Sequence, residues 1–144
     1  MSFKKNLSYK AFSKSKFKSI KHSTYFEVYD ELFSKYRNKK ITFVEIGILG
    51  GGSFFMWRNF FVPRASIIGI DLNSSANKWT KYWFEIFIGD NSDINFWKKF
   101  KKKVGKIDII LDDGGHRYID QITSIECILD NIKHNGLIVV EDTH

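Results

Sequence analysis

Five short apolar runs, each of which ends at or beside a glycine or an acidic residue, constrain the fold of this chain more than any other feature. They are separated by segments whose apolar residues recur at helical spacing. Nearly continuous apolar runs are typical of strands that are covered on both faces, and therefore of a parallel sheet. The runs span residues 41–46, 66–72, 84–88, 107–111 and 137–140.

Helices are predicted between these runs at 53–61, 92–102 and 118–133. Strand–helix alternation predicts an α/β fold, a doubly wound Rossmann-like parallel sheet with strand order 3-2-1-4-5. The second helix would turn Ile94, Trp97 and Phe100 toward the core, and Gly136 would end the third. The third helix carries one apolar stripe, made of Ile119, Ile122, Ile125, Ile128, Leu129 and Ile132.

Ahead of the first run, residues 24–36 predict an amphipathic helix. Thr24 with Glu27 three residues later has the pattern of a capping box. Of the 23 lysines and arginines, seven lie in residues 1–21, which hold no acid, and the other 16 balance the 16 acids. We therefore predict a basic, mobile leader at 1–23 and one domain at 24–144, with its core at 41–144. Binding of the leader to nucleic acid or an anionic membrane is the alternative.

The single cysteine, Cys127, excludes an internal disulfide and suits a reducing compartment. Its apolar neighbours predict a buried, inert thiol. No apolar run reaches the roughly 18 residues that a membrane span needs, and no secretory signal is visible. We expect a cytoplasmic protein.

The first predicted strand leads into a glycine-rich segment, residues 45–53. Gly47 and Gly51 permit a tight turn and a close approach of the backbone to a ligand, and the helix that begins near Ser53 favours an anionic group. Glu45 would offer a fixed negative charge to the ammonium group of a cofactor. A purely structural turn is the alternative, because glycine loops alone are weak evidence.

The second strand ends at Asp71, about 20 residues past the glycine segment, where an acid can accept both hydroxyls of a ribose. The third strand ends at Gly89-Asp90. Asp90 is a candidate to bind the amine of a base, and capping of the next helix is nearly as good an explanation of it. The pairing of loop and acid at the correct spacing points to a nucleotide-like cofactor.

Acidic residues follow both the fourth and the fifth strand. Asp112 and Asp113 follow one, Glu141 and Asp142 follow the other, and the predicted order makes these strands neighbours. Crowded carboxylates repel one another unless they are protonated or bind a metal, and Mg²⁺ prefers such oxygen ligands. His116 lies close enough to act as a base on a metal-bound hydroxyl.

Taken together, residues 45–53, 70–72, 89–90, 112–116 and 136–142 resemble the class I S-adenosylmethionine-dependent methyltransferases. More narrowly, they resemble the metal-dependent sugar O-methyltransferases of macrolide biosynthesis and their cephalosporin-hydroxylase-like relatives. The specific part is Asp-Asp-Gly-Gly-His at 112–116 together with Glu141 and Asp142. The resemblance extends from about residue 24 to the last residue.

The resemblance implies a role for each candidate residue. Asp113 and His116 would be catalytic, with His116 deprotonating a hydroxyl of a sugar or glycosylated small molecule. The metal ligands would be Asp113, Glu141 and Asp142, and the metal Mg²⁺. The S-adenosylmethionine site would comprise Glu45, Gly47, Gly51, Ser53, Asp71, Asp90 and Asp112.

The sequence departs from the family pattern at three places. Leu49 stands where the class has glycine, and Gly115 where relatives more often have serine. Such folds also continue past the fifth strand, whereas this chain stops at residue 144. We therefore expect the fifth strand to be covered by a second copy or a companion chain, and a non-catalytic, partner-dependent fragment is an alternative function.

Two further functions are weighed against the methyltransferase. A NAD-type oxidoreductase also uses a Rossmann loop, but the acids that end strands one and four argue against it. A nucleic-acid methyltransferase would carry an Asn/Asp-Pro-Pro-aromatic signature after strand four, and the only proline is Pro63. A nucleic-acid partner is therefore not expected.

Overall fold

The computed structural model describes residues 2–143, so Met1 and His144, the outermost residues of the predicted leader and domain, lie outside the described residues. The chain divides into two compact units. One comprises Met1–Ile41 and Gly50–Ala65, and the other comprises Thr42–Leu49 and Ser66–His144. This division differs from the predicted boundary at residue 24. We call them the helical unit and the sheet unit.

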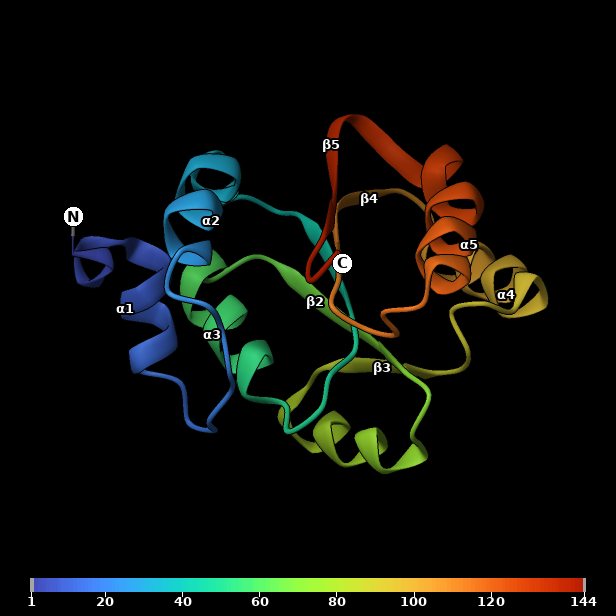
Figure 1. The fold of residues 1–144 in the computed structure, drawn as a ribbon, viewed down its shortest axis with the longest axis horizontal. Helices are drawn as coiled ribbons and strands as arrows, with labels where there is room; N and C mark the ends of the chain where they lie inside the picture. The colour runs from blue at the N-terminus through green and yellow to red at the C-terminus, as the bar shows by residue number, and fades with distance from the viewer. Residues whose placement is uncertain (1, 144) are drawn as a thin grey trace. The chain divides into compact units, whose positions relative to one another are not determined.

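The sheet unit contains a five-stranded, all-parallel sheet in the order β3-β2-β1-β4-β5 (Figure 1). The predicted fold class and strand order are therefore confirmed. β1 is central, and its residues pair with β2 on one side and with β4 on the other. The strands are β1 (Thr42–Ile46), β2 (Ser66–Asp71), β3 (Glu85–Ile88), β4 (Ile107–Asp112) and β5 (Ile132–Val140).

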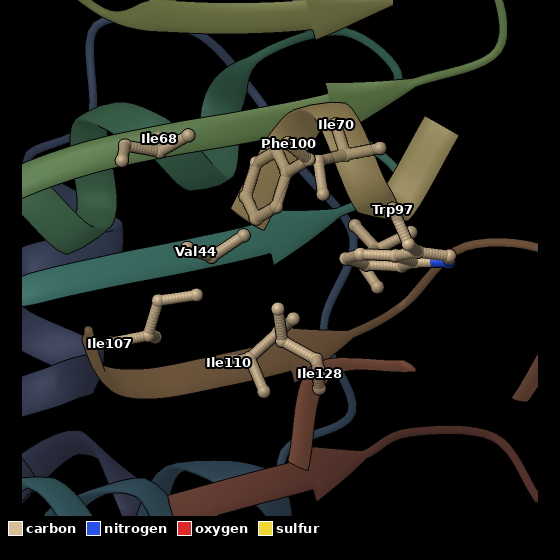
Figure 2. Close-up of a cluster of buried hydrophobic side chains, with 9 residues drawn as sticks. Val44, Ile68, Ile70, Trp97, Phe100, Ile107, Ile110 and Ile128 are labelled. Carbon is tan, nitrogen blue, oxygen red and sulfur yellow. The ribbon is translucent and has the colours of Figure 1, made fainter. Parts of the chain in front are cut away.

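One face of this sheet packs on helices α4 (Ile94–Val104) and α5 (Tyr118–Ile128). Trp97 and Phe100 of α4 are each 1% exposed and lie against the aliphatic side chains of the central strands (Figure 2). The prediction that Ile94 joins them is wrong: it is 57% exposed, because it is the first residue of the helix. The buried cluster is Val44, Ile46, Ile68, Ile70, Trp97, Phe100, Ile107, Ile110 and Ile128.

Half of the apolar stripe of α5 is exposed to solvent. Ile119, Ile122 and Leu129 are 57%, 51% and 59% exposed, and of the stripe only Ile128 is fully buried. The face that α5 buries is mainly polar instead. Its buried residues are Asp120, Gln121, Thr123, Ser124 and Ile128.

The end of α5 also differs from the prediction. The helix stops at Ile128, the short 3-10 helix η4 (Leu129–Asn131) follows, and β5 begins at Ile132. Gly136 lies within β5, beside a shift in the register of β4 and β5. A Cβ at Gly136 would lie 2.9 Å from the carbonyl oxygen of Asp108, so this glycine allows an irregular strand to pass its neighbour.

The predicted helix at 24–36 is present in the helical unit as α2 (Tyr25–Phe33) followed by the 3-10 helix η2 (Ser34–Tyr36). Thr24 precedes α2 but makes no capping hydrogen bond through its side chain, so the predicted capping box does not form. The helix predicted at 53–61 is α3 (Gly52–Phe61). The rings of Tyr29 and Phe33 contact Trp57 at 5.0 and 5.6 Å between centroids.

The predicted mobile leader is helical instead. Residues Phe3–Lys5 form the 3-10 helix η1, and Leu7–Ser13 form α1. The carboxylate of Asp30 accepts hydrogen bonds from the N–H groups of Leu7 and Ser8, at 2.7 and 2.8 Å, and so caps α1. The prediction considered only the lysines of this segment. The aromatic residues between them pack on Phe26, and the ring centroids of Tyr9 and Phe12 each lie 5.2 Å from that of Phe26.

Within residues 2–143, the structure contains no helix of the length and apolar character that crossing a membrane requires.

Candidate functional site

The candidate residues of the sheet unit follow the carboxyl ends of the strands, which is the edge where open α/β sheets bind ligands. Hydrogen bonds between backbone groups continue past the ends of the strands and tie the connecting loops together. The loops that carry the predicted acids are therefore neighbours in space. The bonds run from the N–H of Gly47 to Ile70 (2.8 Å), Gly89 to Asp71 (3.0 Å), Asp113 to Ile46 (2.9 Å) and Glu141 to Asp112 (2.9 Å).

Glu45 and Gly47 occupy the end of the central strand. Glu45 is 0% exposed, so its carboxyl group is enclosed within the fold. Gly47 has φ +85, and a Cβ there would overlap the carbonyl oxygen of Asp113 and lie 2.7 Å from the Cα of Gly114. Glycine is thus required where the loop after β1 passes the loop after β4.

Asp71 connects the loops that follow β1 and β2. One carboxylate oxygen accepts the N–H of Ile48 at 2.9 Å, and the other accepts the N–H of Asn73 at 2.8 Å. Each carboxylate oxygen has a further lone pair, so these bonds leave acceptor capacity for ribose hydroxyls. Asp71 therefore shapes the predicted cofactor loop in addition to any role in binding.

Asp90 forms a local turn. One of its oxygens accepts both the N–H and the hydroxyl of Ser92, at 2.8 and 2.7 Å. These two hydrogen bonds hold the pKa of Asp90 below its usual value, so the carboxylate is ionised at neutral pH. The side chain that caps α4 is that of Asp93, which accepts the N–H of Asn95 at 2.8 Å. Capping of α4 therefore does not explain Asp90.

Asp112 is the most unusual acid of the site. It is 4% exposed, and one oxygen accepts the N–H of Gly114 at 3.1 Å while the other is buried with no hydrogen-bond partner. Burial raises the pKa of Asp112, and the charges of Asp113 and Asp120 raise it further. An unsatisfied buried acceptor of this kind fits a site completed by a hydrogen-bond donor or a cation.

The three predicted metal ligands are near one another through the backbone but do not form a ready-made metal site. Among residues 2–143, no group of three or more histidine, cysteine or acidic side chains is arranged to hold a metal ion. Asp113, Glu141 and Asp142 follow two neighbouring strands at one edge of the sheet, and their role as metal ligands stays a prediction. Asp142 also has a positive φ of 53, which is uncommon for a residue other than glycine.

His116 lies in the loop between β4 and α5 and is exposed. His116 acts to lower the pKa of Asp112, whereas Asp113 and Asp120 act to raise it, so these residues lie near that carboxyl group.

Sequence reasoning missed Asp120, which lies in the first turn of α5. Its side chain is 3% exposed and pairs with Arg117, whose Nε and Nη2 atoms donate to its two oxygens at 3.0 and 2.8 Å. The spacing of Arg117 and Asp120 could have predicted an ion pair across one helical turn. It could not have predicted that the acid is buried.

Gly51 and Ser53 belong to the helical unit. Gly51 precedes α3 with a φ of 73, and Ser53 is 6% exposed in the first turn of that helix. Their predicted contact with the cofactor stays a prediction.

Comparison with known proteins connects this arrangement to a family, although no protein-family model matches the chain. The chain is 33% identical over 121 residues to mycinamicin VI 2''-O-methyltransferase of Micromonospora griseorubida, an alignment that covers 79% of this chain and 30% of that enzyme. It is 32% identical over 121 residues to demethylmacrocin O-methyltransferase of Streptomyces fradiae, again over 79% of this chain and 30% of the relative. The chain thus spans about a third of the length of these relatives.

Comparison of structures points to the same group of enzymes. The structure is similar to that of the MycE methyltransferase from the mycinamycin biosynthetic pathway in complex with Mg, SAH and mycinamycin VI. The TM-score is 0.80 at 31% identity, and the match covers 99% of this chain and 37% of that chain. The resemblance inferred from the sequence is confirmed: this chain is similar in sequence and in structure to sugar O-methyltransferases of macrolide and tetracenomycin pathways, and it has a Rossmann-like methyltransferase fold.

Proposed function

We propose that this chain is the S-adenosylmethionine-binding part of a sugar O-methyltransferase. The observation that carries the proposal is the joint likeness, in sequence and over nearly the whole of this chain's fold, to enzymes whose names describe O-methyl transfer, one of them on a rhamnosyl compound. The solved relative binds SAH and Mg. The acids at the strand ends of this chain are the residue types that such a cofactor and such a metal require.

The proposed cofactor site is built mainly from the sheet unit. Asp71 would accept the ribose hydroxyls while its bonds to Ile48 and Asn73 hold the surrounding loops in place. The buried carboxyl group of Glu45 would face the ammonium group of the methionine part. Asp90 would lie on the adenine side, where its ionised carboxylate can accept a hydrogen bond from the base amine.

Asp113, Glu141 and Asp142 would hold Mg²⁺. The backbone bond between Glu141 and Asp112 supports this assignment because it sets the acids of β5 beside those of β4. A positive charge at this edge would also stabilise the buried oxygen of Asp112 that has no hydrogen-bond partner. The three side chains would have to turn toward a common point when the ion binds. When bound, Mg²⁺ would lower the pKa of a coordinated hydroxyl.

His116 would accept the proton of the sugar hydroxyl on a ring nitrogen. It is exposed at the edge of the sheet, where a glycosylated acceptor has access to it, and it lies three residues after Asp113. A neutral imidazole is suited to this role near pH 7. The remaining requirement is alignment of the acceptor oxygen with the methyl group, which is a matter of positioning.

The names of the relatives support the acceptor class, because one of them is an 8-demethyl-8-alpha-L-rhamnosyl tetracenomycin-C 2'-O-methyltransferase. We propose a hydroxyl of a glycosylated small molecule for this chain. Covering of β5 by a second copy or a companion chain stays a prediction.

The test is calorimetric titration of the chain with S-adenosylmethionine, with and without Mg²⁺. We expect saturable binding that Asp71→Ala abolishes. Asp93→Ala is the matched control, because Asp93 is also an acid that accepts a backbone N–H after a strand, but outside the proposed site. Absence of binding to a cooperatively folded chain, or equal binding by both variants, would refute the proposed cofactor site. His116→Ala should keep cofactor binding and lose methyl transfer to a glycosylated acceptor.

A further inference from the structure

The loop that carries the proposed base is held at both ends by backbone hydrogen bonds. At its start, the N–H of Asp113 bonds to Ile46 at 2.9 Å, and the N–H of Gly114 bonds to the carboxylate of Asp112 at 3.1 Å. At its end, the carbonyl of Arg117 accepts the N–H of Asp120 at 3.0 Å as α5 begins. Gly115 and His116, in the middle of the loop, are exposed.

Asp120 contacts the residues on both sides of His116. On one side, its carboxylate accepts two hydrogen bonds from Arg117, at 3.0 and 2.8 Å. On the other side, it packs so closely on Gly115 that a Cβ there would overlap one carboxylate oxygen and lie 3.1 Å from its Cγ. One buried carboxylate thus fixes the residue before and the residue after the histidine.

Asp120 is itself held rigidly. It is 2% exposed, and its carbonyl accepts the hydroxyl of Ser124 at 2.8 Å. The side-chain amide of Asn91 donates to the same hydroxyl at 3.1 Å, and the carbonyl of Asn91 accepts the indole N–H of Trp97 at 2.8 Å. A buried polar network therefore connects Asp120 to α4. This accounts for the polar face that α5 buries, since a network of this kind is stable when its members are satisfied.

From this geometry we propose that Asp120 is a positioning residue for His116, acting through Arg117 and Gly115. The proposal rests on the proposed function, because it concerns the orientation of the base. It also gives a reason for glycine at position 115: any side chain there would displace the carboxylate. Arg117 is well suited to its part, since a guanidinium forms two parallel bonds to a carboxylate that lysine cannot reproduce.

The test measures His116 directly, without substrate. Ring signals of the histidines are recorded by ¹H–¹³C NMR at about pH 8, where an unperturbed imidazole is neutral. The His116 signal is assigned from its loss in His116→Gln. Arg117→Met, at a residue whose side chain is 70% exposed, removes the ion pair with little risk to folding, and Asp120→Asn removes the charge. Lys133→Met is the matched control, because it breaks the 3.0 Å ion pair with Asp108 elsewhere in the sheet unit.

We expect Arg117→Met and Asp120→Asn to shift or broaden the His116 signals while those of His22 and His134 stay in place. Arg117→Lys should restore them only in part. Lys133→Met should leave His116 unchanged. An unchanged His116 signal in a folded Arg117→Met variant, or equal shifts at His22, His116 and His134, would overturn the proposal.

A second measurement separates this proposal from the proposed function. If the chain transfers methyl groups, Arg117→Met should lower kcat about 10- to 100-fold and leave the KM for S-adenosylmethionine nearly unchanged. An equal loss in kcat with Lys133→Met would contradict a positioning role. If methyl transfer is absent but the His116 signal responds as expected, the proposed function fails and the positioning of His116 by Asp120 stands.

Discussion

Replacing Gly47 by alanine should destabilise the sheet unit strongly, for two reasons that can be separated. The residue has φ +85, where an L-amino acid with a Cβ costs about 1–2 kcal/mol. The new Cβ would also overlap the carbonyl oxygen of Asp113 and lie 2.8 Å from its carbonyl carbon. Because these are backbone atoms, the loop has to move, and overpacking of this kind costs about 1–3 kcal/mol.

The expected loss is therefore about 2–5 kcal/mol, out of a total stability of about 5–15 kcal/mol for a typical domain. Two glycines serve as controls. Gly105 has φ +73, and a Cβ added there would have no neighbouring atom within 4 Å, so Gly105→Ala measures the backbone strain alone. Gly50 has no left-handed φ, and the nearest contact of an added Cβ is 3.8 Å away, so Gly50→Ala should change stability by less than about 1 kcal/mol.

Urea unfolding, followed by circular dichroism, measures all three variants. With a slope of about 1–3 kcal/mol per molar urea, the overpacking cost of about 1–3 kcal/mol should lower the midpoint of Gly47→Ala by about 1 M relative to Gly105→Ala. Equal midpoints for these two variants would refute the reasoning, since they would show that the loops after β1 and β4 do not approach one another as described.

The sheet unit supports three further predictions. Phe100→Ala empties a site that is 1% exposed and should cost about 3–5 kcal/mol in urea unfolding, whereas a loss below about 1 kcal/mol would contradict the packing in Figure 2. Burial raises the pKa of Asp112 in the folded state, so the folded chain binds more protons than the unfolded chain and loses stability as the pH rises above the unfolded pKa of Asp112. Asp112→Asn should remove this loss, and parallel profiles of stability against pH for the two proteins would contradict the raised pKa. The pKa of Asp90 is lowered in the folded state, so its ionised form stabilises the fold at pH values above the unfolded pKa, and this stabilisation is lost in acid. Ser92→Ala removes one hydrogen bond to Asp90 and should cost about 0.5–1 kcal/mol at pH 7, a difference that should vanish once Asp90 is protonated.

The sheet could be predicted from the sequence because its signals are local. A buried parallel strand is apolar at nearly every position, and the residue after it is polar, so both the strands and the candidate acids could be located. The strand order then followed from chain topology, which general rules restrict to few solutions.

The environment of α5 could not be predicted in this way. Its periodicity indicates that the helix has an apolar face and a polar face, but not which one the sheet covers. The choice depends on Asp120 and Ser124, which find partners in Arg117 and Asn91. The contact between Ser124 and Asn91 requires tertiary structure. The spacing of Arg117 and Asp120 could suggest an ion pair, but the sequence gave no signal that Asp120 is buried. The position of Gly136 also depends on tertiary structure, namely the pairing of β5 with β4. The local sequence therefore predicts that Gly136 ends a helix, whereas it lies in an irregular strand.

The helical start of the chain has a practical consequence for shortened versions of this protein. Because residues 1–23 are rich in lysine, they would be the first segment to delete in a shortened version. Yet Phe26 is only 2% exposed because Tyr9 and Phe12 pack on it, and Asp30 holds the N–H groups of Leu7 and Ser8. Trimming would therefore uncover an aromatic surface and an unpaired acid together. A chain that starts at residue 24 should aggregate more readily than the longer one, although it would carry fewer apolar residues.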